Sequence, residues 1–351
     1  MRVLSVVGAR PQFVKLAPIA RAFAGEVDHV VVHTGQHYDE LLSDVFFRDL
    51  GIPAPQVNLA IGSGSHGAQT GAMLTELEPV LERFRPDWVL VYGDTNSTLA
   101  AAVASVKLGL PLAHLEAGLR SFNRAMPEEH NRVLTDHAAD LLLAPTEVAV
   151  GHLRDEGLAD RTLLVGDVMT DVLLQVRDQQ RDAAPVFPEY GEGEYYVATL
   201  HRPANTDDPA RLASILTQLS LLARPVILLA HPRLRAAADV AGVRLDQGAI
   251  DVRDPLAYPD LVSVVARSAG VITDSGGLQK EAFLLRVPCT TVRSETEWVE
   301  TIDLGWNVLA DGDLSTLRGI VERDRPAPTD AAPYGDGHAA ERVLEALSSR
   351  A

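Results

Sequence analysis

Short runs of apolar and β-branched residues alternate along this chain with longer amphipathic segments. The alternation predicts strand–helix–strand units and therefore parallel sheets in an α/β fold. Polar residues directly follow each apolar run, so the candidate functional residues lie where the predicted strands end. The eight runs span residues 3–7, 29–32, 88–92 and 112–115 in the first half, and 195–200, 226–230, 270–273 and 289–292 in the second half.

The repetition of this arrangement in the two halves predicts two sheets whose polar edges face each other. In open parallel sheets, ligands bind beyond the carboxyl ends of the strands. One polar strand end is equally typical of an ordinary loop, but eight of them favour a site. A strand predicted at 165–168 is followed by a charged stretch with Pro and Gly over 177–193. We therefore expect domains at 1–168 and 169–335, with the C-terminal segment 336–351, helical over 339–348, packing back on the first domain.

Length and composition agree with two globular domains. The chain has 351 residues, of which 46% are hydrophobic and 23% charged, which excludes collagen, long disorder and a membrane bundle. The net charge of −17 argues against binding to nucleic acid or anionic membranes, so an anionic ligand needs a local positive site. Cys289 is the single cysteine, which rules out an intrachain disulfide and a cysteine-based metal site. With no signal peptide or spanning run in the sequence, we expect a cytoplasmic protein.

Two segments run from a predicted strand into a helix and are candidate anion sites. The segment 8–12, Gly-Ala-Arg-Pro-Gln, is predicted to present backbone N–H groups beside Arg10 and Lys15. An alternative for Lys15 is a solvated helix lysine. The segment 274–279 contains Ser275, Gly276 and Gly277, and paired glycines let a phosphate approach backbone amides closely. Neither segment is a Walker loop or a G-x-G-x-x-G motif.

Three carboxylates, Asp94, Glu116 and Glu128, lie at or just beyond strand ends of the first domain. Clustered acids can share proton transfer, because mutual repulsion and partial burial move their pKa values apart. Two structural alternatives stay open: Asp94 as the N-cap of a helix over 95–108, and Glu128 as part of an acidic first helical turn. His201 and His231 end strands of the second half. Since common hydrolase motifs are absent from the sequence, acids and anion sites together favour an anionic sugar nucleotide as substrate.

Seven ordered sequence blocks now make the chain recognisable. It resembles the non-hydrolysing UDP-N-acetylglucosamine 2-epimerases over essentially its whole length. The blocks are GARP at 8–11 with Lys15, YGDT at 92–95, HLEAGLR at 114–120, PEE at 127–129 with Asn131 and Arg132, TLHR at 199–202, TDSGGLQ at 273–279 and PYGDG at 333–337.

The resemblance implies the glycosyltransferase-B architecture, two Rossmann-like domains facing across a cleft that holds the active site. It also implies that UDP leaves C1 while the C2 proton is removed, and that UDP adds back to the 2-acetamidoglucal after protonation of the other face. Neither nicotinamide, another cofactor nor a metal is expected. The implied catalytic residues are Asp94, Glu116, Glu128 and His201, and the implied substrate contacts are Arg10, Lys15, Arg132, His231, Ser275, Gly276, Gly277 and Glu281. A homodimer is what the family suggests.

Departures from the better-known bacterial members concern activation and substrate. Gln36–Asp39 and Ala72 stand where those members bind substrate as an activator, and Leu261 and Trp298 stand where they carry Phe and Arg near the nucleotide. The short sequence motifs at 8–13, 121–123, 278–281 and 297–300 resemble those of the UDP-2,3-diacetamido-glucuronate 2-epimerases more closely. We expect UDP-N-acetylglucosamine as substrate, the diacetamido-glucuronate as the first alternative, a glycosyltransferase of the same fold as the second, and a nucleotide-sugar sensor as the third.

Overall fold

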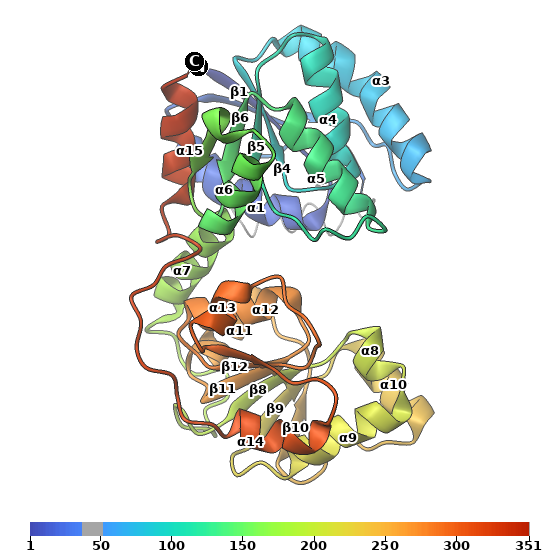
Figure 1. The fold of residues 1–351 in the computed structure, drawn as a ribbon, viewed down its shortest axis with the longest axis vertical. Coiled ribbons are helices and arrows are strands. Elements are labelled where there is room, and N and C mark those ends of the chain that lie inside the picture. The colour runs from blue at the N-terminus through green and yellow to red at the C-terminus, as the bar shows by residue number, and fades with distance from the viewer. Residues whose placement is uncertain (37–51, 351) are drawn as a thin grey trace. The chain divides into compact units, whose positions relative to one another are not determined.

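The computed structural model describes residues 1–36 and 52–350, without the side chain of Arg10. The chain divides into two compact units: unit 1 comprises Met1–Val172 and Ala332–Ala351, and unit 2 comprises Leu173–Ala331. Each unit is built on one parallel sheet (Figure 1). The first segment of unit 1 ends within helix α7, between Val172 and Leu173.

The sheet of unit 1 has the strand order β3-β2-β1-β4-β5-β6-β7, and every neighbouring pair is parallel. Its strands are β1 (Arg2–Val7), β2 (Asp28–His33), β3 (Val57–Asn58), β4 (Trp88–Tyr92), β5 (Leu112–Leu115), β6 (Leu141–Ala144) and β7 (Thr162–Leu164). Its helices are α1 (Arg10–Phe23), α3 (His66–Phe84), α4 (Asn96–Lys107), α5 (Pro127–Ala138), α6 (Glu147–Asp155), the start of α7 (Val168–Gln180) and α15 (Ala339–Ser348).

The sheet of unit 2 has the order β10-β9-β8-β11-β12-β13, again with parallel neighbours. Its strands are β8 (Tyr196–Thr199), β9 (Val226–Leu229), β10 (Ile250–Arg253), β11 (Gly270–Thr273), β12 (Cys289–Thr291) and β13 (Asn307–Leu309). Its helices are α8 (Pro203–Thr206), α9 (Pro209–Ser220), α10 (Pro232–Ala241), α11 (Tyr258–Ala266), α12 (Gly276–Leu284), α13 (Val299–Asp303) and α14 (Leu317–Val321).

The central strands form because both faces of each sheet are covered, which favours continuous apolar runs over alternating ones. In unit 1, all five residues of β4 are buried. Val3 and Leu90 pack in one cluster with Phe13 of α1 and Val343 of α15, whereas Leu4 packs on the opposite face in a cluster with α3. Two hydrophobic layers therefore hold the sheet rigid, and its strand ends become a fixed platform for polar side chains.

The strand predicted at 165–168 is wrong. Strand β7 ends at Leu164, and Gly166 adopts a left-handed φ of 91° that ends the extended run. The side chain of Asp167 then accepts a hydrogen bond from the backbone N–H of Met169 at 2.8 Å, at the start of α7. The segment is thus a helix start, and α7 leads into unit 2.

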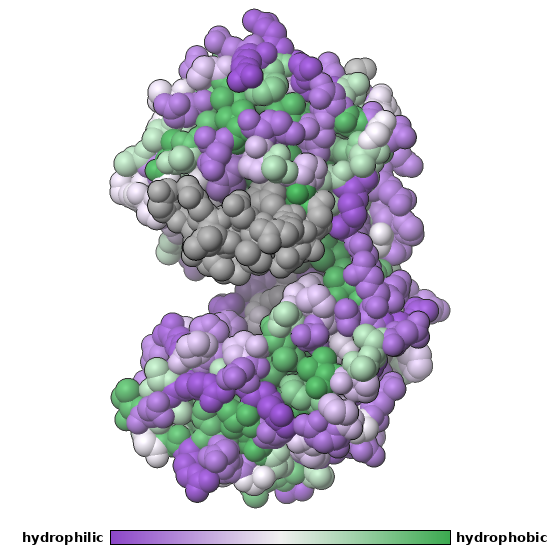
Figure 2. All heavy atoms as spheres, turned by 180° about the vertical axis from the view of Figure 1, so that it is seen from behind, coloured by the Kyte–Doolittle hydropathy of each residue, from purple (hydrophilic) through white to green (hydrophobic). Residues whose placement is uncertain are grey.

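Hydrophilic residues, interspersed with hydrophobic ones, cover much of the face of each unit seen in Figure 2. Among the described residues, no helix combines the length and hydrophobicity needed to span a membrane. Within the same part of the chain, no cluster of three or more His, Cys, Asp or Glu side chains has a geometry that would hold a metal ion.

Candidate active site

Two of the predicted acids lie side by side at the carboxyl edge of the unit 1 sheet. Strands β4 and β5 are paired so that Tyr92 lies opposite Leu115. Glu116 directly follows β5, and Asp94 follows β4 after one glycine. Glu116 has a left-handed φ of 73°, which is rare for a residue with a side chain. Strain of this kind gathers at functional sites, where the surrounding structure holds it in place.

Lys15 of α1 forms an ion pair with Glu116, although the two residues are 101 positions apart. The Lys15 side chain is only 14% exposed, so the alternative of a solvated helix lysine is wrong. Burial by itself lowers the pKa of Lys15, but the adjacent Glu116 carboxylate and the charge of Asp94 raise it above its ordinary value. Gly93 allows this approach, because a Cβ there would lie 3.0 Å from Glu116 Oε2.

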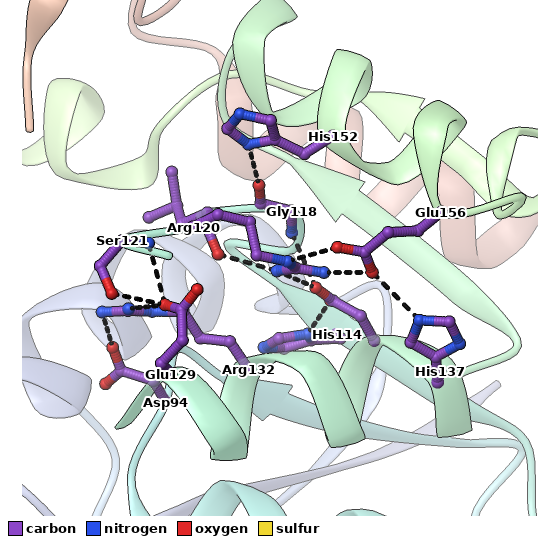
Figure 3. A network of polar contacts seen from close by, with 12 residues as sticks. Asp94, His114, Gly118, Arg120, Ser121, Glu129, Arg132, His137, His152 and Glu156 are labelled. Carbon is purple, nitrogen blue, oxygen red and sulfur yellow. Dashed lines mark hydrogen bonds and ion pairs between the residues drawn. The ribbon is translucent and has the colours of Figure 1, made fainter. Parts of the chain in front are cut away.

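Helix α5 holds Asp94 from the other side (Figure 3). Arg132 donates from Nη2 to the Asp94 carboxylate, and Asn131 Nδ2 donates to the Asp94 backbone oxygen at 2.9 Å. Arg132 is itself fixed by Glu129 through a 2.9 Å bond. Because Thr95 caps α4, the alternative that Asp94 is the N-cap is wrong. The carboxylate is 29% exposed and remains accessible.

Glu128 occupies the first turn of α5 together with Glu129, so the alternative of an acidic first turn describes its local structure correctly. Glu128 is half-buried, whereas Glu129 is buried. Glu129 accepts hydrogen bonds from the backbone N–H groups of Ser121 and Phe122, both at 2.9 Å, and from the Ser121 hydroxyl. Burial by itself raises the pKa of Glu129, but these donors and Arg132 lower it. Glu129 is therefore an anion with a structural role, and the Glu128 carboxylate takes no part in these hydrogen bonds.

The anion site predicted at residues 8–12 is not available as expected. The side-chain oxygen of Gln12 accepts the backbone N–H groups of Gly8 at 2.8 Å and Ala9 at 3.0 Å. Gln12 is buried and also donates to the backbone oxygen of Tyr92 at 2.8 Å. The two amides are thus used inside the protein. The side chain of Arg10 lies outside the described part of the structure.

Unit 2 brings most of its predicted site residues to one cavity of about 300 Å³. The cavity opens at the carboxyl ends of β8, β9 and β11, where ligands bind in open parallel sheets. Its lining includes His201, His231, Ser275, Gly277 and Glu281. A larger cavity of about 590 Å³, lined by Arg177, Tyr190 and Arg267 among others, lies elsewhere in this unit and contains none of the predicted residues.

One end of this cavity is the N-terminus of α12. Ser275 is its N-cap and accepts the backbone N–H of Leu278. A Cβ at Gly277 would meet no atom within 4 Å, so open space lies in front of this residue. A Cβ at Gly276 would lie 3.6 Å from Arg202 Nη2, 3.8 Å from Glu297 Oε2 and 3.9 Å from Arg293 Nη1, and Arg293 is itself paired with Glu297. Backbone donors, the helix dipole and the Arg202 guanidinium therefore favour an anion at this point, while Glu297 offsets the charge of Arg293.

Asp274 positions His201, one of the two histidines that line this cavity. The buried carboxylate accepts the backbone N–H groups of His201 and Arg202 at 2.9–3.1 Å and the side-chain amide of Asn205 at 3.0 Å. His201 Nδ1 lies 3.1 Å from the same carboxylate. With Nδ1 held in this way, His201 turns Nε2 away from Asp274. His231 has a different local role, since its Nδ1 accepts the backbone N–H of Arg233 and caps α10.

Glu281 lies at the other side of the cavity, where Tyr258 donates a 3.2 Å hydrogen bond to it. Burial raises the pKa of Glu281 above its ordinary value, while Lys280 and Tyr258 oppose the change. Trp298 donates its indole N–H to the Gly276 backbone oxygen at 2.7 Å, and the Lys280 ammonium lies 4.2 Å from the centre of its ring. Trp298 thus braces the first turn of α12.

Comparison with known proteins identifies this arrangement. A family model described as UDP-N-acetylglucosamine 2-epimerase matches residues 21–348. The chain belongs to this family. A UDP-2,3-diacetamido-2,3-dideoxy-D-glucuronate 2-epimerase from Pseudomonas aeruginosa is 44% identical, and the match covers 99% of each chain. A UDP-N-acetylglucosamine 2-epimerase from Methanocaldococcus jannaschii is 37% identical, with 99% of each chain covered.

Solved structures of family members have the same fold as this epimerase. The Methanocaldococcus jannaschii enzyme in complex with UDP-GlcNAc and UDP matches with a TM-score of 0.81, covering 99% of this chain and 100% of that chain. The Neisseria meningitidis enzyme bound to UDP-GlcNAc is 26% identical and also has a TM-score of 0.81, with the same two coverages. The predicted family and the GT-B-like α/β fold are confirmed, and the protein is an isomerase, a UDP-sugar 2-epimerase. The transferase and sensor alternatives are not supported.

The sequence did not predict the roles of several residues around the site of this epimerase. The sequence marks Arg202 and Arg293 as strand-end cations, but only the structure places their guanidinium groups beside Gly276. The role of Glu129 as an acceptor for Ser121 and Phe122 likewise shows only in the structure. Asp274 carried a signal of its own, since it stands at a strand end before Ser275. His37, Tyr38 and Asp39, part of the departure from the activator motif, lie outside the described residues.

Proposed function

We propose that this epimerase inverts C2 of UDP-2,3-diacetamido-2,3-dideoxy-D-glucuronate by eliminating UDP and adding it back. The observation that carries the mechanism is the anion seat at α12, where amide donors, Arg202 and the Arg293–Glu297 pair surround Gly276. The identity of 44% to the Pseudomonas aeruginosa enzyme supports the substrate. The short sequence motifs at 121–123 and 297–300 resemble those of the same subgroup and support the same substrate.

Residues of unit 2 hold the nucleotide in this proposal. The diphosphate gains negative charge as the C1–O bond breaks, and donors already aimed at it lower the energy of that state. Ser275, the α12 amides, Arg202, Arg293 and His201 supply these donors. Glu281 accepts hydrogen bonds from the ribose hydroxyls, as the family resemblance implies.

Residues of unit 1 move the C2 proton. A base takes the proton, the C2–H electron pair forms the C1=C2 bond, and the C1–O pair leaves with UDP. In the second half, an acid returns a proton to the other face of C2, and a phosphate oxygen of UDP attacks C1. Asp94, Glu116 and Glu128 are the proposed acid/base groups, because removal and return on opposite faces need more than one. Lys15 pairs with Glu116, and Arg132 pairs with Asp94, so each of these two acids has a cation beside it.

UDP-N-acetylglucosamine is the second candidate substrate. The Methanocaldococcus jannaschii relative is named for this reaction, and its structure contains UDP-GlcNAc and UDP. The two candidates differ at C3 and C6 of the sugar, and the proposed chemistry at C1 and C2 is the same for both.

A proton-exchange experiment tests the function. We expect the protein, incubated with each UDP-sugar in deuterated water, to place deuterium at C2 and to form the C2 epimer, with the higher kcat/KM for the diacetamido-glucuronate. Equal or better turnover of UDP-N-acetylglucosamine would reverse the choice of substrate. UDP binding without deuterium at C2 for either sugar would overturn the epimerase proposal itself.

Matched variants test the roles of the acids. Asp94→Asn, Glu116→Gln and Glu128→Gln are each expected to lower kcat by about 10²–10⁴, the range of general acid/base effects, while UDP affinity is kept. Glu76→Gln is the control, because Glu76 is an exposed acid on α3 of the same unit. Wild-type turnover in all three acid variants would end the assignment.

A homodimer remains a prediction that sedimentation equilibrium can measure.

A further inference from the structure

A charge network that includes His114, Arg120 and Glu156 lies in the same region of unit 1 as Asp94 (Figure 3). His114, in β5 two residues before Glu116, has no exposed surface. Its Nε2 lies 2.7 Å from the backbone oxygen of Gly93, and its Nδ1 lies 2.6 Å from Asp136 Oδ1 of α5. Both ring nitrogens therefore face oxygen atoms at hydrogen-bond distance.

The partners decide how many protons the ring carries. A backbone oxygen can only accept, so Nε2 must be the donor in the bond to Gly93. Asp136 also accepts from Arg120 Nη1 at 2.7 Å and from the backbone N–H of Gly118 at 3.1 Å, both through Oδ2. Arg120 is always charged and Gly118 N–H can only donate, so these two groups favour the ionised form of Asp136 whatever the state of His114. Since Asp136 is a carboxylate, the 2.6 Å bond needs a proton on Nδ1 as well.

Charge balance supports the same protonation state. Arg120 also forms a two-bond pair with Glu156, through Nε at 2.7 Å and Nη2 at 2.9 Å. With a protonated His114, the network contains two cations, His114 and Arg120, and two anions, Asp136 and Glu156. A neutral His114 would leave an excess negative charge next to fully buried groups, which is costly in the protein interior.

The network touches the backbone of both acid-bearing loops. His114 holds the Gly93 carbonyl, which belongs to the peptide that leads into Asp94. Asp136 holds the Gly118 N–H, two residues after the strained Glu116. The titratable groups that face His114 directly are Asp136 of α5, with Arg120 behind it. Lys15 and Glu116 lie on the far side of Gly93, where they would contact a Cβ.

We propose that His114 is a doubly protonated imidazolium and a positioning residue that sets the direction of the Asp94 carboxylate through the Gly93–Asp94 peptide. It does not touch the substrate and transfers no proton. The kinetic part of this inference rests on the proposed role of Asp94, whereas the protonation state does not depend on any substrate.

Nitrogen NMR on the wild-type protein with labelled histidine tests the protonation state. At pH 7, both ring nitrogens of His114 are expected to carry a directly bonded proton. The signals are assigned by their loss in His114→Asn or His114→Gln. An unprotonated ring nitrogen in His114 would overturn the imidazolium.

A pair of variants tests the positioning role. An Asn amide reaches the place of Nδ1 and a Gln amide the place of Nε2, so only His114→Gln keeps a donor to Gly93. We expect His114→Asn to lower kcat about a hundredfold, the cost of a misplacement near 1 Å, with little change in KM. His114→Gln should retain about ten times more turnover than His114→Asn. Equal or reversed activities of the two variants would overturn the positioning role.

Two controls separate this inference from other failures. His137→Gln changes the exposed end of the same network, where His137 Nε2 lies 3.0 Å from Glu156, and should keep wild-type kcat. UDP affinity should stay unchanged in both His114 variants, because the anion seat belongs to unit 2. Full turnover of Asp94→Asn would refute the proposed function, yet the nitrogen spectrum would still decide the state of His114.

Discussion

The carboxylate of Asp274 offers the sharpest test of how the anion seat of this epimerase is assembled. Asp274→Asn keeps the shape of the side chain but removes its charge and one of its two accepting oxygens. The amide can turn its oxygen toward Arg202 N–H and Asn205, which now bond to Oδ2. Its NH₂ group then faces His201 Nδ1, which now lies 3.1 Å from an accepting oxygen.

The expected loss of stability follows from these bonds. A hydrogen bond to a charged group contributes about 1.5–3 kcal/mol, and a neutral one about 0.5–1.5 kcal/mol. Three donors bond to Oδ2: the backbone N–H groups of His201 and Arg202, and the Asn205 amide. Replacing the charged acceptor by a neutral one at these three bonds lowers the unfolding free energy of unit 2 by about 3 kcal/mol. Asp254→Asn is the matched control, because Asp254 belongs to the same unit but its side chain is 90% exposed. A change within error is expected there.

The pH dependence gives a second, independent signature. Burial by itself raises the pKa of Asp274, but His201, Asn205 and the Arg202 N–H lower it below its ordinary value. A lowered carboxyl pKa stabilises the fold above the unfolded value of about 3.9, and this contribution disappears as the pH falls through the folded value. The difference between wild type and Asp274→Asn should therefore be full at pH 7 and shrink below about pH 4.

Urea unfolding followed by fluorescence measures this difference. Trp298 and Trp306 report on unit 2 in a Trp88→Phe background, in which the tryptophan of unit 1 is removed. Trp88 suits this change because its buried indole N–H has no hydrogen-bond partner among the described residues. UDP affinity should fall together with stability, since the His201–Arg202 segment loses its anchor. Wild-type stability and UDP affinity in Asp274→Asn would refute the reasoning.

Three further predictions follow from individual contacts. Gly277→Ala adds a methyl group that meets no protein atom, so stability should stay equal or rise by at most about 1 kcal/mol, while calorimetry should show UDP affinity about tenfold weaker. Unchanged UDP affinity would place the phosphate elsewhere. Lys15→Met leaves Glu116 without its cation, and kcat at pH 7 should fall about 10- to 100-fold, as expected for a lost charge-assisted bond, with partial recovery in Lys15→Arg. Asp171→Ala removes the acceptor of the first two N–H groups of α15, which bond to it at 3.1 and 2.8 Å, at a cost of about 1–2 kcal/mol. Amide exchange in α15 should quicken while UDP binding is kept, and unchanged exchange would contradict the capping role.

The sequence by itself determined eight of the strands, the order of the units along the chain and the residue types of the site. Strands β4, β5 and β11 begin and end at the predicted residues, because each is a buried, mainly apolar run that a glycine or an acidic residue follows. Periodicity and composition carry that information locally. Strands β3, β7 and β13 are missed because two or three residues show no period of their own. Strands β6 and β10 are also missed, although each has four residues.

Only the tertiary structure decided which polar groups are free to bind a ligand. Gln12 takes the amides that were expected to hold an anion, and Lys15 meets Glu116 across 101 residues of sequence. His114 of β5 meets its partner Asp136 on α5, 22 residues further along the chain, at 2.6 Å. Hydrogen bonds and ion pairs depend on distances of about 3 Å, and such distances exist only after the sheet has brought remote strand ends together.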